Sequence, residues 1–366
     1  MEVNYSYLQE QFEDHKKIFD DLDKLIETAD YTLGEELEKF EKSFAEIIGT
    51  KYAIGVGSGT DALFLSLKAL NIGVDDEVIT TPNTFYATVG SIVTAGATPV
   101  FVDNNEEFTV DVNLIEDAIT KKTKAIMPVH LTGCPADMPE ILNIAKKHDL
   151  QVIEDACQAI SAAINGKNVG TFGITAGFSL HPLKNLNVWG DGGLITTNSD
   201  EIKDKLILLR NHGLINRDEC AVFAYNSRLD TLQAIVGNHL IKQTDYITNT
   251  RIENAKLFDE ELSKLKDCIT IPPRRENFKQ VYHTYVIHAK DRDKLLAHLL
   301  EKGVDAKVHY PIPLHLQPAA KYLGYKEGDF PVCEQHIKSI ITLPVHQHLT
   351  YEQKQYIIDT VKEFYR

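Results

Sequence analysis

Short apolar runs rich in β-branched residues alternate with amphipathic stretches from Tyr52 to Thr197. The runs are nearly continuously apolar, which is typical of strands buried on both faces of a sheet. Stretches between them, such as Thr60–Leu70 and Met138–His148, have the spacing of helices with one buried face. This alternation predicts an α/β fold with a mainly parallel sheet between helices. The predicted strands are Tyr52–Val56, Glu77–Thr81, Thr98–Asp103, Thr123–His130, Gln151–Asp155, Thr175–Leu180 and Gly193–Thr197.

The pattern changes on both sides of this region. Two helical stretches, Tyr7–Ala29 and Gly34–Ile48, precede the first predicted strand. Helical spacing covers Thr231–Leu265, and a second set of strands and helices follows from Val281. We therefore expect a large domain over residues 1–245 and a smaller C-terminal α/β domain over residues 246–366.

Composition and charge narrow the class of protein. The net charge of −15 disfavours nucleic acid as a partner, because a phosphate backbone needs a concentrated basic surface. Residues 1–20 lack the apolar core of a signal peptide, and no apolar run reaches membrane-spanning length. Five scattered cysteines fit reduced thiols and form no metal-ligand pattern. We expect a soluble, cytoplasmic protein without a metal site.

The first motif with chemical potential is Gly57–Asp61, which follows a predicted strand and opens a helix. Its backbone N–H groups and the positive end of the helix could hold a phosphate. It lacks the lysine and spacing of a P-loop and the third glycine of a dinucleotide-binding motif. The alternative is a glycine-rich turn in which Thr60 only caps the helix.

The second motif is Glu154-Asp155, at the end of an apolar strand. A carboxylate at a buried strand end is costly unless it is paired or hydrogen-bonded. One partner that would justify Asp155 is a protonated ring nitrogen. The alternative is an aspartate that caps the following helix.

The third motif is Phe178–Asn185, which contains Lys184 and precedes the glycine-rich turn Gly190–Gly193. A lysine removed from water has a lowered pKa, and its neutral amine is a nucleophile toward aldehydes. Ser179 could offer its hydroxyl to the same phosphate as the first motif. The alternative is a structural lysine in a loop.

Together the three motifs supply what pyridoxal phosphate requires. They are a phosphate cradle, a carboxylate for the pyridine nitrogen and a lysine that condenses with the aldehyde. The protonated ring then accepts electrons from the substrate carbon. Phe85 follows another strand end and could stack on the ring, or could simply belong to the core.

The chain resembles the DegT/DnrJ/EryC1/StrS sugar aminotransferases, which are fold-type I pyridoxal-phosphate enzymes, over nearly its full length. Matching stretches occur in order along the whole chain. They are Gly55–Leu63, Asp76–Pro82, Gly96–Asp103, Glu154–Ala159, His181–Leu186, Gly190–Gly193, Tyr225–Asp230, His283–Tyr285, Tyr310–His315 and Leu343–His346.

The resemblance implies a role for each matching residue. Lys184 carries the cofactor and moves the proton, Asp155 binds the pyridine nitrogen, and Gln158 bonds the ring hydroxyl. Phe85 stacks on the ring. The phosphate is bound by Gly59, Thr60 and Ser179, with Asn226 reaching it from the partner subunit of a homodimer. Candidates for substrate contacts are His130, Arg228, His283, Tyr285, Tyr310 and His315.

Each histidine in this last set could instead satisfy a local hydrogen bond, and Arg228 could brace the dimer interface. Gln347 departs from the family pattern, in which proline is frequent.

The implied reaction transfers an amino group from L-glutamate to a nucleotide-linked keto sugar, with a 3-oxo sugar favoured over a 4-oxo sugar. Such a product would serve a surface polysaccharide or a secondary metabolite. Two alternatives remain. The first is a dehydratase using the same cofactor, which the retained Lys184 disfavours because the well-known dehydratases carry histidine there. The second is a regulatory member that binds the cofactor without turnover.

Overall fold

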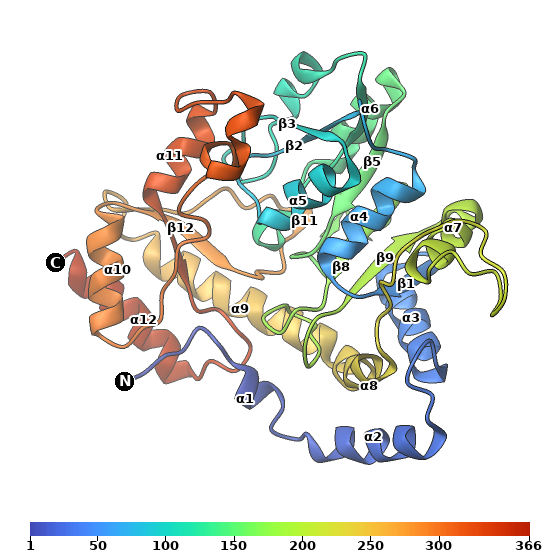
Figure 1. The fold of residues 1–366 in the computed structure, drawn as a ribbon. Helices are drawn as coiled ribbons and strands as arrows, with labels where there is room; N and C mark the ends of the chain where they lie inside the picture. Colours follow the sequence, from blue (N-terminus) through green and yellow to red (C-terminus); the bar gives the residue numbers. More distant parts are fainter.

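The computed structural model describes the whole chain, residues 1–366. Its centre is a seven-stranded sheet in the order β1-β9-β8-β5-β4-β2-β3 (Figure 1). Strand β9 is antiparallel to both of its neighbours, and all other neighbouring pairs are parallel. The predicted mostly parallel sheet is therefore confirmed. Its strands are β1 (Tyr52–Val56), β2 (Glu77–Thr80), β3 (Thr98–Phe101), β4 (Thr123–Ile126), β5 (Gln151–Asp155), β8 (Thr175–Ser179) and β9 (Gly193–Thr197).

Successive residues of these strands pack on opposite faces of the sheet, as strand geometry requires. In β5, Val152 joins the apolar cluster that contains α6, whereas Ile153 joins the cluster that contains α4. Both faces are thus buried under helices, which explains the continuous apolar runs. One face carries α4 (Gly59–Ala69), α5 (Tyr86–Ala95) and α7 (Asp200–Arg210), and the other carries α2 (Lys16–Thr28), α3 (Glu35–Ile48), α6 (Met138–His148) and α8 (Thr231–Leu240).

Two long predicted helices are divided in the structure. The N-terminal stretch forms α1 (Leu8–Gln11) and α2, with a turn between them. Phe12 packs edge-on against Trp189 there, and a ring nitrogen of His15 lies 3.0 Å from the Phe12 carbonyl oxygen, so the chain bends onto the core. The later stretch becomes α8 and α9 (Thr244–Leu262), joined by the short 3₁₀ helix η4 (Ile241–Gln243).

The C-terminal part has its own sheet of three antiparallel strands, β10, β12 and β13. These strands and α9, α10 and α12 enclose a separate apolar cluster, which also takes in Val3. Val3 pairs with Val304, so the first residues lie beside the C-terminal part (Figure 1). A domain boundary near residue 245 stays a prediction. The remaining strands and α-helices are β6 (Ala163–Ile164), β7 (Lys167–Asn168), β10 (Ile269–Thr270), β11 (Phe278–Lys279), β12 (Tyr285–Ala289), α10 (Arg292–Glu301), α11 (Pro331–Ser339), β13 (Ile340–Leu343) and α12 (Tyr351–Phe364).

None of the helices combines the length and the apolar character that crossing a membrane requires.

Candidate active site

A cavity of about 260 Å³ lies where parallel strands β1, β2, β5 and β8 end. This is the edge at which open α/β sheets bind ligands. Nine of the predicted site residues line the cavity, although they come from segments far apart in the sequence. They are Gly59, Thr60, Phe85, Asp155, Gln158, Ser179, Lys184, His283 and Tyr310.

The N-terminus of α4 forms one end of the cavity. The Ser58 hydroxyl caps this helix by accepting a hydrogen bond from the Asp61 N–H at 3.1 Å. The N–H groups of Gly59 and Thr60 have no acceptor within the chain, so they remain available to an anion. A Cβ atom on Gly59 would lie 2.7 Å from Ser179 Cβ. These features fit a phosphate, with Gly59 allowing its close approach to the backbone.

Asp155 ends β5 and lines the cavity. Its Oδ2 accepts a hydrogen bond of 2.6 Å from the Thr88 hydroxyl, and its Oδ1 accepts one of 3.2 Å from the Cys157 N–H. No arginine or lysine forms an ion pair with it, so the carboxylate is free to bind a cationic ring nitrogen. The alternative reading as a helix cap finds no support, because no helix begins immediately after β5.

Lys184 lies in the loop between β8 and β9, with its backbone fixed. Its N–H donates to the His181 carbonyl at 2.8 Å, and its carbonyl accepts from Asn187 Nδ2 at 2.9 Å. Burial lowers the pKa of the Lys184 amine, while nearby Cys157 and Asp155 act in the opposite direction. A lowered pKa increases the fraction of neutral amine, which is the form that attacks an aldehyde.

Gln158 and two aromatic residues form the other walls. The Gln158 Oε1 accepts a hydrogen bond from the Thr132 N–H at 2.9 Å, and Nε2 lies 3.4 Å from the Tyr310 hydroxyl. Phe85 keeps 48% of its surface exposed and has its ring centroid 5.9 Å from that of Tyr310. An aromatic ring that is only half covered can stack on a planar ligand, whereas a core residue cannot.

Three other candidates lie away from the cavity and have partners within the protein. His130 is fully buried, with Nε2 3.1 Å from Glu154 Oε2, and its Nδ1 accepts from the Ala136 N–H. The Tyr285 hydroxyl donates to Asp259 in the C-terminal core, and a ring nitrogen of His315 lies 3.0 Å from Glu334. Their geometry therefore supports structural roles instead of substrate contacts.

Arg228 and Asn226 also lie outside the cavity of their own chain. Arg228 Nη1 donates to Asn211 Oδ1 at 3.1 Å. Asn226 is exposed and adjoins a loop whose Phe223 side chain is 99% exposed.

The sequence assigns no role to Tyr5, His181 or Asp191, which also line the cavity, as does His309. Burial lowers the pKa of His309 to about 4 and that of His283 well below its usual value, so both are neutral near neutral pH. His181 and Asp191 stand in the matching stretches His181–Leu186 and Gly190–Gly193, whereas no local pattern marked Tyr5, which reaches the cavity through the tertiary fold.

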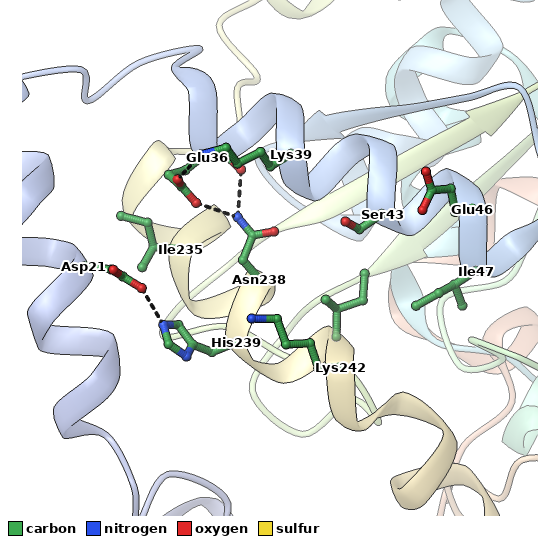
Figure 2. Close-up of a pocket in the computed structure, with 11 residues that line it drawn as sticks. Asp21, Glu36, Lys39, Ser43, Glu46, Ile47, Ile235, Asn238, His239 and Lys242 are labelled. Atoms are coloured by element: carbon green, nitrogen blue, oxygen red, sulfur yellow. Dashed lines mark hydrogen bonds and ion pairs between the residues drawn. The ribbon is translucent and has the colours of Figure 1, made fainter.

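A wider hollow of about 710 Å³ lies between α2, α3 and α8, and it contains none of the predicted residues. Its polar side chains largely satisfy one another. His239 Nε2 lies 2.9 Å from Asp21 Oδ2, and Asn238 Nδ2 donates to Glu36 (Figure 2). In the smaller cavity, by contrast, Lys184 and the N–H groups of Gly59 and Thr60 remain available to a ligand.

Known proteins share the sequence pattern and the fold of this chain. The sequence pattern of the DegT/DnrJ/EryC1/StrS aminotransferase family matches residues 13–362. The chain belongs to this family. It is 44% identical to a pleiotropic regulatory protein of Geobacillus stearothermophilus over 100% of the chain and 99% of that protein. It is 38% identical to dTDP-3-amino-3,4,6-trideoxy-alpha-D-glucose transaminase of Streptomyces venezuelae, covering 93% of the chain and 90% of the relative. It is 39% identical to UDP-N-acetyl-3-dehydro-alpha-D-glucosamine 3-aminotransferase of Acidithiobacillus ferrooxidans, covering 92% and 90%.

Solved structures of the aminotransferase family superpose closely on this chain. DesV of S. venezuelae, in complex with a ketimine intermediate, has a TM-score of 0.96 at 36% identity and covers 99% of this chain and 98% of its own. NtdA of Bacillus subtilis, with bound pyridoxamine phosphate (PMP), has a TM-score of 0.92 at 31% identity and covers 99% and 85%. Family membership and such structures confirm the predicted fold-type I architecture and transaminase activity, and they indicate pyridoxal phosphate as the cofactor.

Proposed function

We propose that this aminotransferase moves the amino group of L-glutamate to a nucleotide-linked keto sugar, with the carbonyl at C-3. One observation carries the chemistry. A buried lysine of lowered pKa, an aspartate without a cationic partner and two free N–H groups at a helix N-terminus meet in one cavity. Pyridoxal phosphate, when bound, supplies the aldehyde and the electron-accepting ring for transamination.

The residues that line the cavity would bind the cofactor and transfer the proton. Gly59, Thr60 and Ser179 hold the phosphate, and Asp155 keeps the pyridine nitrogen protonated. Gln158 bonds the ring hydroxyl, and Phe85 covers the ring. Lys184 would hold the cofactor through its aldehyde and would then carry the proton between the donor or sugar carbon and C4′ of the cofactor.

The relatives support the choice of a 3-oxo sugar. The names of the S. venezuelae and A. ferrooxidans proteins place the amino group at C-3 of a dTDP-linked and a UDP-linked sugar, respectively. Our chain is similarly related to both, at 38% and 39% identity. A carbonyl at C-3 is common to both relatives, whereas their nucleotides differ, so we propose the carbonyl position and leave the nucleotide open. The aminated sugar would enter a surface polysaccharide or a secondary metabolite, and the cytoplasm is our proposed compartment.

A homodimer is part of the proposal. Asn226 does not line its own cavity, and the neighbouring loop exposes Ile215, Val222 and Phe223. An exposed apolar loop beside a polar residue without a local role suits contact with a second copy of the chain. In that arrangement, Asn226 would reach the partner's phosphate site.

The test is a panel of dTDP- and UDP-linked 3-oxo and 4-oxo sugars, incubated with glutamate and scored by mass spectrometry of the aminated product. We expect a 3-amino product together with 2-oxoglutarate. A 4-amino product would overturn the carbonyl position. Loss of a sugar hydroxyl without gain of nitrogen would favour the dehydratase. A cofactor absorbance unchanged by glutamate would favour a regulatory protein, the description carried by the G. stearothermophilus relative.

A further inference from the structure

The first residues of the chain are bound to its C-terminal part, although they precede the family match at residue 13. The Val3 N–H donates to the Gly303 carbonyl, and the Asp305 N–H donates to the Val3 carbonyl, both at 2.9 Å. His346 Nε2 lies 3.1 Å from the Asn4 carbonyl oxygen. Val3 and Asn4 are therefore fixed against the C-terminal part, and the next residue, Tyr5, lines the cavity.

Tyr7 in this segment contacts the backbone of the lysine loop. Its side chain is buried, and its hydroxyl lies 3.1 Å from the Lys184 carbonyl oxygen and 3.3 Å from that of Leu183. Asn187 Nδ2 donates to the same Lys184 carbonyl, whereas no other group of the chain donates to the Leu183 carbonyl. Tyr7 thus links two consecutive peptide groups next to the reactive side chain.

The Tyr7 ring is itself fixed. It stacks on His346 with centroids 5.0 Å apart, and the Arg251 guanidinium lies 5.0 Å from its centroid. Arg251 is held by Gln347 Oε1 at 3.0 Å and by the Tyr282 carbonyl at 3.1 Å. Burial raises the pKa of the Tyr7 phenol despite the nearby guanidinium, so the hydroxyl stays protonated and donates.

We propose that Tyr7 is a positioning residue for Lys184. The Lys184 amine must reach the cofactor aldehyde and then the substrate carbon. Because the side chain is long, the rate of these reactions depends on where the Lys184 backbone is anchored. Tyr7 supplies that anchor because its hydroxyl bonds the lysine loop, while its ring is held by Arg251 and His346. This inference rests on the proposed role of Lys184 and goes beyond it by assigning a function to the N-terminal segment.

The test compares the Tyr7→Phe holoenzyme with wild type. Phenylalanine keeps the ring that contacts His346 and Arg251 and removes only the hydroxyl. We expect the rate constant for the glutamate-driven change in cofactor absorbance to fall about tenfold, with the KM for glutamate changing less than about twofold. The midpoint of the pH-dependent absorbance change of the resting enzyme should shift by roughly 0.3 units or more, because the amine environment changes. Tyr322→Phe is the control, since Tyr322 is 66% exposed.

An unchanged rate constant and an unchanged midpoint would overturn the proposal, whatever happens to the melting temperature. If Tyr7→Phe does not fold, Asn187→Ala takes its place, because it removes the other side-chain donor to Lys184. The same shifts are then expected, and their absence counts against the anchor. Borohydride labelling of the wild-type enzyme is run in parallel. A label away from Lys184 would show that the proposed function failed, whereas a label on Lys184 with unshifted variants would show that only this inference failed.

Discussion

The hydroxyl of Thr88 donates a hydrogen bond of 2.6 Å to Oδ2 of Asp155. The two residues belong to different elements, α5 and β5, and Thr84 lies 2.8 Å from the Thr88 hydroxyl on its other side. Thr88 therefore fixes one oxygen of the carboxylate as an acceptor. A carboxylate oxygen has two lone pairs, so a protonated pyridine nitrogen can still donate to the carboxylate that Thr88 holds in place.

Removing the Asp155 charge is expected to lower kcat by at least about two orders of magnitude, because the electron-accepting ring depends on that charge. Thr88→Val, which removes only the supporting hydrogen bond, should lower kcat roughly tenfold. The measurement is steady-state kinetics of Asp155→Asn and Thr88→Val with the best sugar from the panel. A near-normal kcat for Asp155→Asn would show that this residue only shapes the loop.

Lys184→Ala is expected to abolish turnover while leaving the cavity able to bind pyridoxamine phosphate. The variant loses both the amine that attacks the aldehyde and the group that moves the proton. Borohydride reduction followed by peptide mass spectrometry should place the label of the wild-type enzyme on Lys184. A fully active alanine variant would contradict the assignment.

Gly59→Ala should raise the dissociation constant of pyridoxal phosphate at least about tenfold, because the phosphate cradle needs close approach to the backbone. The added methyl group would lie 2.7 Å from Ser179 Cβ and 3.0 Å from Cys157 Sγ. Gly90→Ala is the matched control, since nothing lies within 4 Å of its added methyl group. Cofactor titration followed by absorbance measures both. Equal affinities would show that the cradle tolerates a side chain.

The sequence predicted the parts of the structure that depend on local pattern. Continuous apolar runs marked the seven strands, because both faces of the sheet are buried. Lys184 and Asp155 were singled out because a charged residue at or just beyond the end of a buried strand is unusual, and the structure places both on one cavity. Tyr5, Tyr7 and Thr88 were not found, since each acquires its role through a contact with a distant segment.

The roles of the histidines likewise depend on contacts with distant segments, which the sequence does not reveal. His130 and His283 looked equivalent as substrate candidates, yet the structure pairs His130 with buried Glu154 and places His283 on the cavity wall. The partner that decides the role of each ring comes from another strand or loop. Similarly, Gln347 stands where the family favours proline, and only the structure shows that it holds Arg251.

His336 should make the fold less stable in mild acid. Burial lowers its pKa from 6.5 to about 4, so between these values the unfolded chain binds a proton that the folded chain does not. The free energy of unfolding therefore falls as the pH drops through this window, by at most about 3 kcal/mol from this residue. Urea unfolding at about pH 7 and at about pH 5 measures this change. Between these pH values, the free energy of unfolding should fall less for His336→Gln than for wild type. Exposed His15→Gln is the control, and an equal loss in both variants would contradict the prediction.

The active site is expected to be shared between two subunits, with Lys184 from one and Asn226 from the other. Lys184→Ala and Asn226→Asp should each be nearly inactive, the second because an added carboxylate repels the phosphate. In a mixed dimer, the site that uses the intact Lys184 receives the intact Asn226 from the other subunit. Random reassociation makes half of the dimers mixed, so about a quarter of full activity should return.

The same mixture also tests the alternative, in which each active site is formed by one chain alone. If Lys184 and Asn226 serve the site of one chain, every site in a mixed dimer carries one of the two substitutions, and no activity returns. Native mass spectrometry must first confirm that mixed dimers have formed. Asn226→Ala, which removes the amide without adding charge, should give a milder single-variant defect and the same recovery after mixing. A shared site would be ruled out if mixed dimers of both pairs show no more activity than the residual activity of the Asn226 variant explains, because the two pairs differ in charge but not in which subunit they alter.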